Sequence, residues 1–414
     1  MLELFPITAR VERGELSVGG VPASRLVAEH GTPLLVLDEE TLRAQARAYR
    51  AAAPDALVVY GTKAFANVEL LRVLASEGIG ADVSTLGELA FAVRAAIPGE
   101  RIVFHGNNKS DDELRAAADA GATVVLDAPD EPDRAAAAGV RRVLVRLTPG
   151  VEAVTHEAIA TAHDSSKFGL SRDAALAAID RARGLGLDVA GVHFHVGSQL
   201  AQIDESLLAV DRLAAFCEQA RAELGWTPSV VDLGGGLGVR HNRDEHPPEI
   251  DTWVAPLLER LRERWPEPVQ VVLEPGRSLV SRAGVTLYEV GVVKESGGVS
   301  YVAIDGGMSD NPRPQLYGAR YEALLANRAD ELVTGVYRVA GKHCESGDVL
   351  IDAVELPRPE RGDVLAVPAT GAYTLALSSN YNGIPRPEVV LVRDGEARTI
   401  RRRETVDDVL ALES

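Results

Sequence analysis

The sequence is poor in cysteine, and no stretch of it has the composition of a membrane-spanning segment. Its two cysteines, Cys217 and Cys344, are too few for a disulfide framework or a zinc ribbon, which favours a reducing compartment. No apolar run approaches the roughly 18 residues that a transmembrane helix needs. Residues 1–6 lack a basic stretch followed by an apolar core, so we expect no signal peptide. These absences predict a cytoplasmic protein.

Basic residues are also scarce relative to acidic ones. There are 43 lysines and arginines against 61 acidic residues, which gives a formal net charge of −18. Nucleic acids and anionic membranes require a basic surface, so we expect neither as a partner. A small anionic substrate needs only a local group of basic side chains and stays possible. The length of 414 residues, 46% of them hydrophobic, predicts two or three domains with large cores.

Apolar runs alternate with amphipathic helical stretches from Pro33 onward. A first strand at 34–37 leads to a helix from Glu39, with Asp38 as its N-cap. Eight further strands are predicted at 57–60, 80–83, 101–104, 123–126, 142–147, 189–195, 229–233 and 269–273. Helices are predicted at 67–77, 86–96, 111–120, 172–183, 205–224 and 250–265. Eight such strand–helix units over about 250 residues predict an α/β fold, a closed (β/α)8 TIM-type barrel.

The pattern changes after Gly276, where the helical stretches largely stop. Strands are predicted at 286–293, 300–304, 332–339, 364–367 and 388–392. Residues 1–27 consist of short extended pieces that are too short to fold alone and must pack on a later part of the chain. We therefore predict a barrel domain, 28–277, and a mostly β domain resembling a sandwich or barrel, built from 1–27 and 278–414.

Polar side chains follow the predicted barrel strands at the end where barrel enzymes have their active sites. They are Lys63, Asp82, Ser84, His105, Asp127, Arg146, His193, His195, Asp232 and Glu274. A lysine in a cavity loses its proton readily, as a Schiff-base lysine must. On position alone, Lys63 fits an ordinary surface lysine better.

Two motifs near the end of the barrel suit a phosphorylated ring. The run 233–238, Leu-Gly-Gly-Gly-Leu-Gly, is either a tight turn without a ligand or a phosphate-binding loop. His193 and His195 lie two residues apart on one strand face. No third metal ligand is near them in sequence, so we predict no metal. An imidazole stacked on a flat ring, with Ser198 at a phosphate, fits better.

Glu274-Pro275-Gly276-Arg277 is the sharpest signal in the barrel. A carboxylate there can accept a hydrogen bond from a protonated pyridine nitrogen, which pyridoxal phosphate needs in order to act as an electron sink. The alternative is a strand-end salt bridge between Glu274 and Arg277. In the second domain, Cys344 is either an inert buried thiol or, beside Lys342 and His343, a thiol tuned for proton transfer.

These motifs, in this order, resemble the diaminopimelate decarboxylases, within the pyridoxal-phosphate enzymes that share the alanine-racemase-type barrel. The resemblance runs from about residue 2 to residue 412. It rests on the segments 60–64, 105–110, 166–169, 193–199, 233–238, 274–277, 313–317, 344–348, 371–373 and 379–382. The run Cys344-Glu345-Ser346-Gly347-Asp348 is the most substrate-specific. Departures are small: Thr62 and Phe65 replace the commoner Val and Asn, and 309–312 vary the usual run.

The resemblance implies decarboxylation of meso-2,6-diaminopimelate to L-lysine, the last step of lysine biosynthesis, with pyridoxal 5'-phosphate as cofactor. It also implies a homodimer in which the Cys344 segment completes the partner's site. Lys63 would hold the cofactor covalently, and Cys344 would return a proton to the substrate. The implied cofactor-binding residues are Lys63, His195, Ser198, Gly234, Gly235, Gly236, Glu274, Pro275, Gly276, Arg277 and Tyr373. The implied substrate-binding residues are Arg277, Arg313, Tyr317, Glu345 and Tyr373.

Three other functions fit parts of the sequence. A decarboxylase of ornithine, arginine or lysine would need an acidic residue for the distal cation of its substrate, where this chain offers Arg313. An amino-acid racemase of this fold places an arginine at the pyridine nitrogen, where this chain has Glu274. A non-catalytic cofactor-binding protein would leave Cys344 and the second domain unexplained.

Overall fold

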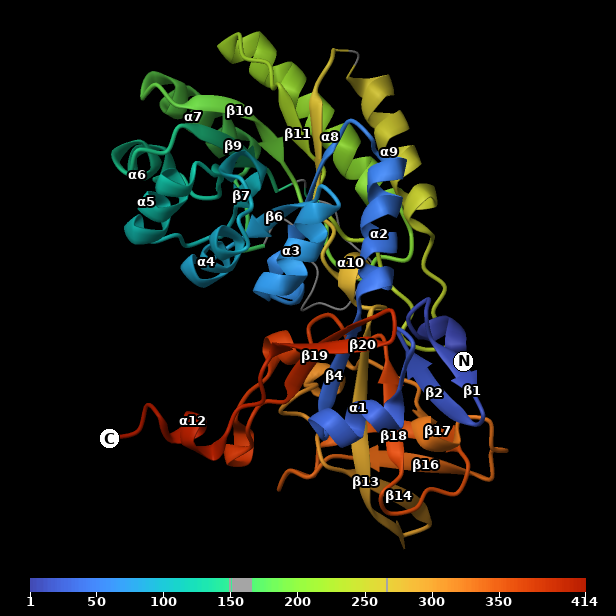
Figure 1. The fold of residues 1–414 in the computed structure, drawn as a ribbon. Helices are drawn as coiled ribbons and strands as arrows, with labels where there is room; N and C mark the ends of the chain where they lie inside the picture. The colour runs from blue at the N-terminus through green and yellow to red at the C-terminus, as the bar shows by residue number, and fades with distance from the viewer. Residues whose placement is uncertain (149, 151–165, 266) are drawn as a thin grey trace. The chain divides into compact units, whose positions relative to one another are not determined.

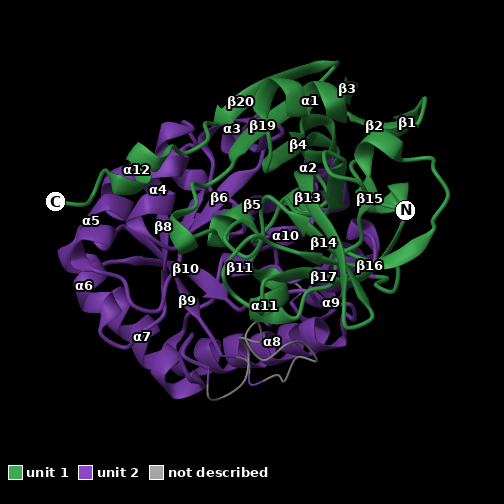
Figure 2. Ribbon diagram, turned by 90° about the horizontal axis from the view of Figure 1, so that it is seen from below, with its two compact units in different colours: residues 1–44, 239–246, 279–414 green, residues 45–238, 247–278 purple. Residues whose placement is uncertain are grey.

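The structure, a computed structural model, describes residues 1–148, 150, 166–265 and 267–414. The chain forms two compact units (Figure 2). Unit 1 comprises residues 1–44, 239–246 and 279–414, and unit 2 comprises residues 45–238 and 247–278. Unit 2 thus begins at Gln45, whereas the sequence pattern placed the start of the barrel domain at residue 28.

Unit 2 contains a closed parallel barrel of eight strands in the described residues, which confirms the predicted fold (Figure 1). Its strands are β5 (Leu57–Gly61), β6 (Gly80–Val83), β7 (Ile102–Phe104), β8 (Thr123–Leu126), β9 (Arg142–Arg146), β10 (Asp188–His193), β11 (Val230–Asp232) and β12 (Gln270–Leu273). Its helices include α3 (Val68–Ser76), α4 (Leu86–Arg94), α5 (Asp111–Ala120), α6 (Glu131–Ala137), α7 (Arg172–Gly184), α8 (Asp204–Leu224) and α9 (Ile250–Arg264). Helix α6 is the one that periodicity missed.

The barrel strands carry a layer of apolar side chains and, two residues further along the same face, a layer of polar ones. The apolar layer consists of Val59, Val103, Val125, Leu144, Ala190, Val230 and Val272. Because strand side chains alternate with a period of two, residues two positions further along share the same face. Those positions include His105, Asp127, Arg146, Asp232 and Glu274. The strand pairing of β10 shifts between Val189 and Gly191, and His193 then pairs in register with Arg146 and Asp232.

Unit 1 is built on a branched sheet of nine strands in the described part of the chain. Its main path runs β17 (Val349–Leu356), β16 (Gly335–Ala340), β14 (Val299–Ile304), β13 (Gly284–Ser296), β4 (Leu34–Asp38), β19 (Glu388–Arg393) and β20 (Glu396–Arg401). Strand β18 (Val364–Pro368) pairs with β13 and with β15 (Leu324–Leu325). The mostly β second domain is therefore confirmed.

Strand β4 explains the difference at the first domain boundary. It was predicted as a strand, but it pairs with β13 and β19 in unit 1 and with no strand of the described barrel. Helix α2 (Glu39–Ala52) follows directly. A carboxylate oxygen of Asp38 accepts the backbone N–H of Thr41 at 3.0 Å, as the predicted N-cap requires.

The N-terminal segment packs against the later strands of unit 1, as predicted. It forms a small sheet from β1 (Arg10–Glu12), β2 (Glu15–Val18) and β3 (Val21–Pro22), followed by helix α1 (Ala23–His30). The prediction of extended structure up to residue 27 missed this helix. Leu16 and Leu26 share one apolar core with Val285 and Leu287 of β13. The termini of the chain therefore belong to one folding unit.

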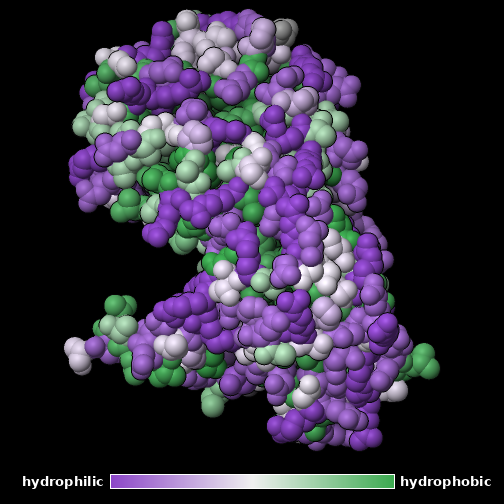
Figure 3. Space-filling model, in the orientation of Figure 1, coloured by the Kyte–Doolittle hydropathy of each residue, from purple (hydrophilic) through white to green (hydrophobic). Residues whose placement is uncertain are grey.

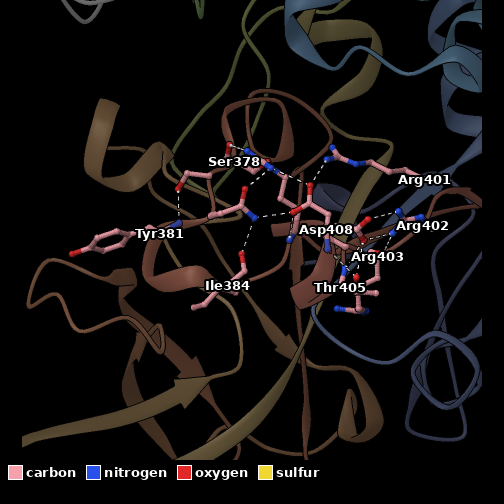
Figure 4. Close-up of polar contacts among 12 residues, drawn as sticks. Ser378, Tyr381, Ile384, Arg401, Arg402, Arg403, Thr405 and Asp408 are labelled. Carbon is pink, nitrogen blue, oxygen red and sulfur yellow. Dashed lines mark hydrogen bonds and ion pairs between the residues drawn. The ribbon is translucent and has the colours of Figure 1, made fainter. Parts of the chain in front are cut away.

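The C-terminal segment is tied to unit 1 by arginines and acidic side chains (Figure 4). Arg402 forms an ion pair with Asp408, which also caps helix α12 (Val406–Leu410) together with Thr405. Arg403 donates to the carbonyl oxygens of His30 and Pro33. These contacts fasten the end of the chain to the segment between α1 and β4.

Among the described helices, none combines the length and the apolar character that crossing a membrane requires. The face of the molecule seen in Figure 3 is covered mainly by hydrophilic residues, with apolar ones scattered between them.

Candidate active site

Lys63 lies directly after β5, in a one-turn helix spanning Thr62–Ala64. The turn buries Thr62, whose hydroxyl donates to the carbonyl oxygen of Asp82 at 2.7 Å, and it leaves Lys63 exposed. Lys63 nevertheless lines a cavity of about 130 Å³. The other lining residues are Asp82, Ser84, Glu88, His105, Gly106, Arg146, Phe168, His193, His195 and Glu274. The prediction that Lys63 lies at a cavity is confirmed. The prediction that its side chain is desolvated is wrong, because Lys63 is exposed.

Glu274 lies at the end of β12 between two imidazoles. His193 Nε2 is 3.3 Å from Glu274 Oε2, within hydrogen-bond distance. His105 Nε2 is 2.5 Å from Glu274 Oε1, a charge contact outside the angular range of a hydrogen bond. The two rings meet edge to face, with centroids 4.7 Å apart. Each oxygen of this carboxylate therefore has an imidazole beside it.

The electrostatics of the cluster favour an anionic Glu274. Burial raises the pKa of this carboxyl, but the neighbouring imidazoles of His105 and His193 outweigh burial and hold it well below the ordinary value. Burial lowers the pKa of His193 to about 4, against the opposing pull of Glu274. Burial also raises the pKa of Asp232 well above its usual range, with Glu274 adding to the effect. The protonated form is thus favoured at Asp232 and not at Glu274.

His195 and the glycine run come into contact. His195 lies two residues beyond the end of β10, and its Nδ1 accepts the backbone N–H of Gly235 at 3.3 Å. Burial and the nearby Lys63 charge hold the pKa of His195 well below its ordinary value, so the ring is neutral. A Cβ at Gly234 would lie 2.6 Å from the carbonyl oxygen of Phe194, and one at Gly235 would lie 2.3 Å from that of Glu274. The close approach of neighbouring backbone requires glycine at both positions.

Ser198 and Arg277 form a polar pair between the loop after β10 and the segment after β12. Arg277 begins the short helix α10 (Arg277–Val280), after Pro275 and Gly276, and is buried. Its guanidinium donates to the Ser198 hydroxyl at 3.0 and 3.3 Å. A buried cation beside a hydroxyl is a setting suited to an anionic oxygen.

A second layer of ion pairs supports the cavity. Arg146 pairs with Asp127 at 3.2 Å and lies over the Phe168 ring, 4.5 Å from its centroid. Lys109 is fully buried and pairs with Glu131 at 3.0 Å. A Glu131 oxygen also accepts the backbone N–H of Asp127 at 2.6 Å. These pairs fasten the loop after β7 to helix α6.

In unit 1, Cys344 lies in the loop between β16 and β17 and is exposed, as is Glu345. The backbone N–H of Cys344 donates to Asn382 Oδ1 at 3.0 Å. His343 is buried, and its Nδ1 lies 2.6 Å from Asp348 Oδ2. The imidazole next to Cys344 in sequence therefore contacts a carboxylate. The sequence predicted a cationic setting from Lys342 and His343, without this acidic partner.

Asp348 organises this loop. Besides His343 Nδ1, its carboxylate accepts the backbone N–H groups of Met308 at 2.7 Å and of His343 at 3.0 Å. A Cβ at Gly341 would lie 2.0 Å from an Asp348 oxygen. Gly341 and Asp348 therefore fix the backbone that presents Cys344.

The remaining predicted substrate-binding residues also lie in unit 1. Arg313 begins helix α11 (Arg313–Tyr317), is buried, and donates through Nη1 to the Tyr321 hydroxyl at 2.6 Å. Its Nε has no hydrogen bond within the described residues. Tyr317 and Tyr373 are half-buried, and Tyr373 has a positive φ of 57°. Arg313 thus keeps a donor available for a ligand.

The barrel cluster can be tested for the groups it could hold. Ligand atoms of His105, His193, Asp232 and Glu274 all lie within 4.8 Å of one another, a donor set that a divalent ion could use. No third ligand is near His193 and His195 in sequence, but folding brings two carboxylates beside His193, and the absence of a metal stays a prediction. A protonated ring nitrogen also fits: Glu274 Oε1 is buried and accepts no hydrogen bond among the described residues.

Comparisons with known proteins decide the family. Residues 39–281 match the family model described as pyridoxal-dependent decarboxylase, pyridoxal binding domain. The diaminopimelate decarboxylase of Actinosynnema pretiosum subsp. auranticum is 46% identical, over 99% of this chain and 95% of its own length. The chain belongs to the diaminopimelate decarboxylase family.

Solved structures of similar proteins agree with this assignment. A diaminopimelate decarboxylase from M. jannaschii, in complex with L-lysine, has a TM-score of 0.93 at 32% identity, covering 99% of this chain and 98% of that one. A lysine/ornithine decarboxylase from Vibrio vulnificus has a TM-score of 0.80 at 28% identity, covering 90% and 97%. The fold is thus shared between the diaminopimelate decarboxylase family and the first rival function.

Sequence reasoning missed the partners that surround the expected residues of this family member. Lys109 was noted only as part of a motif, and its partner Glu131 was not considered. The apolar sequence of β8 before Glu131 was the available signal that this acid is buried. Asp232 was placed at its strand end without a role. Spacing alone does not give these neighbours, because Lys109 pairs with a residue of helix α6 and Asp232 lies beside Glu274, which follows another strand.

Proposed function

We propose that this protein decarboxylates meso-2,6-diaminopimelate to L-lysine and CO2 with pyridoxal 5'-phosphate as cofactor. The observation that carries the proposal is the Glu274 carboxylate, kept anionic between two imidazoles in a cavity that Lys63 lines. The chain's membership of the diaminopimelate decarboxylase family supports the substrate.

Several residues of the chain would hold the cofactor. Lys63 would bind its aldehyde carbon covalently, and Glu274 would accept the ring N–H. Ser198, Arg277 and the glycine run at 234–236 would surround its phosphate, with Tyr373 as a further contact and His195 against the ring. When bound, pyridoxal phosphate supplies an electron sink for the electron pair left behind as CO2 departs.

The other residues bind the substrate and move its protons. Arg313 and Tyr317 offer charged and hydroxyl donors for the distal carboxylate, and Glu345 offers an acceptor for the distal ammonium. Arg277 and Tyr373 are further proposed contacts. The Cys344 thiol would donate its proton to the substrate carbon that lost CO2, and the resulting thiolate would regain a proton from solvent. Lys63 would then displace the product amine.

Release of CO2 from four amino acids tests the substrate. We expect turnover of meso-diaminopimelate and little from ornithine, arginine or lysine, since Arg313 would repel a distal cation. Preference for any of those three would reject the assignment. No turnover at all, with the cofactor bound, would favour a non-catalytic binding protein.

We also propose a cytoplasmic homodimer with shared active sites, on the strength of the family resemblance and the scarcity of cysteine. In such a dimer the Cys344 loop of one subunit completes the barrel site of the other. Mixing inactive Lys63→Ala and Cys344→Ala subunits should then restore about a quarter of the wild-type activity, since random exchange leaves one intact site in each mixed dimer. Absence of any recovery after verified subunit exchange would contradict shared sites.

A further inference from the structure

Three carboxylates and two imidazoles are buried together in the barrel: Asp82, Asp232, Glu274, His105 and His193. Carboxylates in such a setting cannot all ionise freely, because each negative charge raises the proton affinity of the others. Burial, aided by the Glu274 charge, raises the pKa of Asp232 well above its usual value. Burial raises the pKa of Asp82 to about 6, although His105 opposes this. The three carboxyl groups therefore compete, and ionisation of one of them disfavours ionisation of the others.

Contacts with the imidazoles differ among the three carboxylates. Glu274 has an imidazole nitrogen at each oxygen, at 2.5 Å for His105 and 3.3 Å for His193. Asp82 lies 3.7 Å from His105 Nε2, too far for a hydrogen bond. Asp232 Oδ1 accepts the N–H of Gly234 at 2.9 Å, and its Oδ2 has no hydrogen bond within the described residues. The arrangement thus stabilises charge on Glu274 above the other two.

We propose that His105 and His193 are positioning residues that hold Glu274 as an anion, so that the proton shared with the cofactor stays on the ring nitrogen. The inference rests on the proposed function, in which Glu274 faces that nitrogen. His193 donates through Nε2 and fixes Oε2, while His105 stabilises the charge on Oε1. Oε1 keeps a lone pair for the ring N–H, because the His105 contact does not have hydrogen-bond geometry.

The physical reason is a competition for one proton. A ring nitrogen and a carboxylate share it, and the electron sink is strong only when the proton is on nitrogen. A carboxylate stripped of its imidazole neighbours in a buried site becomes a stronger base and takes the proton itself. The two histidines thereby set the strength of the sink without touching the reacting carbon.

Other charged groups also face this cluster and must be kept constant in any test. They are Lys63 and Glu88 near Asp82, and Arg146 near His193 and His195. Substitutions at His105 and His193 leave all of them in place.

The test is ¹⁵N NMR of the holoenzyme reconstituted with ring-¹⁵N pyridoxal phosphate, at pH 7.5. We compare wild type with His105→Ala, His193→Ala, His193→Gln and Glu274→Gln. His30→Ala is the matched control, since His30 Nδ1 also contacts a glutamate, Glu388 at 3.0 Å, in unit 1 and outside the proposed machinery. We expect the ring nitrogen of wild type and His30→Ala to be protonated.

For His105→Ala and His193→Ala we expect the resonance to move toward the neutral-pyridine value. The ratio of molecules with the proton on the ring nitrogen to molecules with the proton on Glu274 should fall about ten- to a hundredfold for each lost contact that stabilises the carboxylate charge. The value of kcat should fall with it, while KM for diaminopimelate changes little. His193→Gln retains an N–H donor for Glu274 Oε2 and should recover part of the shift, which separates stabilisation of the carboxylate from a merely structural role.

Two results would overturn the inference. One is an unchanged ring-nitrogen resonance in both alanine variants while Glu274→Gln shifts it. The other is a stoichiometric divalent ion in the holoenzyme that His105→Ala removes, because metal-bound imidazoles could not play this part. An unchanged resonance in Glu274→Gln itself would instead refute the proposed pairing of Glu274 with the cofactor, so the two failures are distinguishable.

Discussion

In the barrel unit Glu274, His105 and His193 are buried and contact one another, whereas in unit 1 Cys344 and Glu345 are exposed in a loop that the Asp348 carboxylate holds. Glu274, His105 and His193 form direct side-chain contacts within 3.3 Å. The Cys344 loop is fixed instead by Asp348, through two backbone N–H groups and His343. The two regions are therefore prepared for their tasks in different ways.

The difference follows from what each task requires. Tuning a ring nitrogen needs charges fixed in a dry, preorganised site, where they act at full strength. Delivering a proton to a substrate carbon needs an accessible group on a well-placed backbone. Substitutions in the barrel should accordingly change the binding or the spectrum of the cofactor. Substitutions in the Cys344 loop should change turnover while the cofactor stays bound.

The largest expected effect is that of Lys63→Ala. Without the amine no covalent link to the cofactor forms, so the absorbance band near ~420 nm and its sensitivity to borohydride should vanish, and activity should fall below detection. Lys294→Ala, an exposed lysine of β13, serves as the control and should keep both. A coloured, borohydride-sensitive Lys63→Ala protein would show that another residue holds the cofactor.

Cys344→Ala should slow turnover by about 10²–10⁴-fold, the range for losing a general acid, while the yellow colour persists. Steady-state CO2 release and the absorbance spectrum check the two halves of this expectation. Cys217→Ala is the comparison, since Cys217 is buried within α8. A fully active Cys344→Ala enzyme would remove the residue from the mechanism.

Asp348→Asn should reduce kcat by about ten- to a hundredfold, because a charge-assisted contact of this kind contributes about 1.5–3 kcal/mol to holding the loop. The cofactor spectrum should stay unchanged, and thermal unfolding should begin at a lower temperature. Asp352→Asn, an exposed position of β17, provides the control. Equal kcat and stability in the two variants would mean that Asp348 does not organise the loop.

The smallest effect concerns pH and Asp310, whose carboxylate accepts hydrogen bonds from Tyr288 and the N–H of Gly307. Burial raises its pKa to about 7, so the folded state binds a proton more tightly than the unfolded one. Its contribution to stability is fully present below pH ~4 and is lost as the pH rises through 7. Asp310→Asn should thus gain stability relative to wild type between pH 5 and pH 8, by chemical denaturation. A pH-independent difference would contradict the shift.

The barrel and its polar layer could be predicted because both depend on local rules. Strand alternation places Glu274 and His105 on the same face, and the strand-end rule places them together. Strand β4 looked the same in sequence as a barrel strand, yet it pairs with β13 and β19, far along the chain. Strand partners are a non-local choice that no short pattern records.

The sequence predicted which residue types surround the cavity, but not most of the neighbours that set their charges. The sequence placed Lys63 in a desolvated setting, but the turn that buries Thr62 leaves the lysine exposed. The pairing of Lys109 with Glu131 and the raised pKa of Asp232 depend on burial and on neighbours from other parts of the chain. Burial and charge coupling emerge only when the strands close.

The opposite settings of the two cysteines have a practical consequence. Burial raises the pKa of the Cys217 thiol to about 12 and keeps it unreactive, whereas Cys344 is exposed in its loop. A thiol reagent should therefore modify one position per chain, so a fluorescent or spin label can be attached there without mutating the protein. On the proposed role of Cys344 as proton donor, such a probe would report on the substrate site, and oxidation of this thiol would inactivate the enzyme.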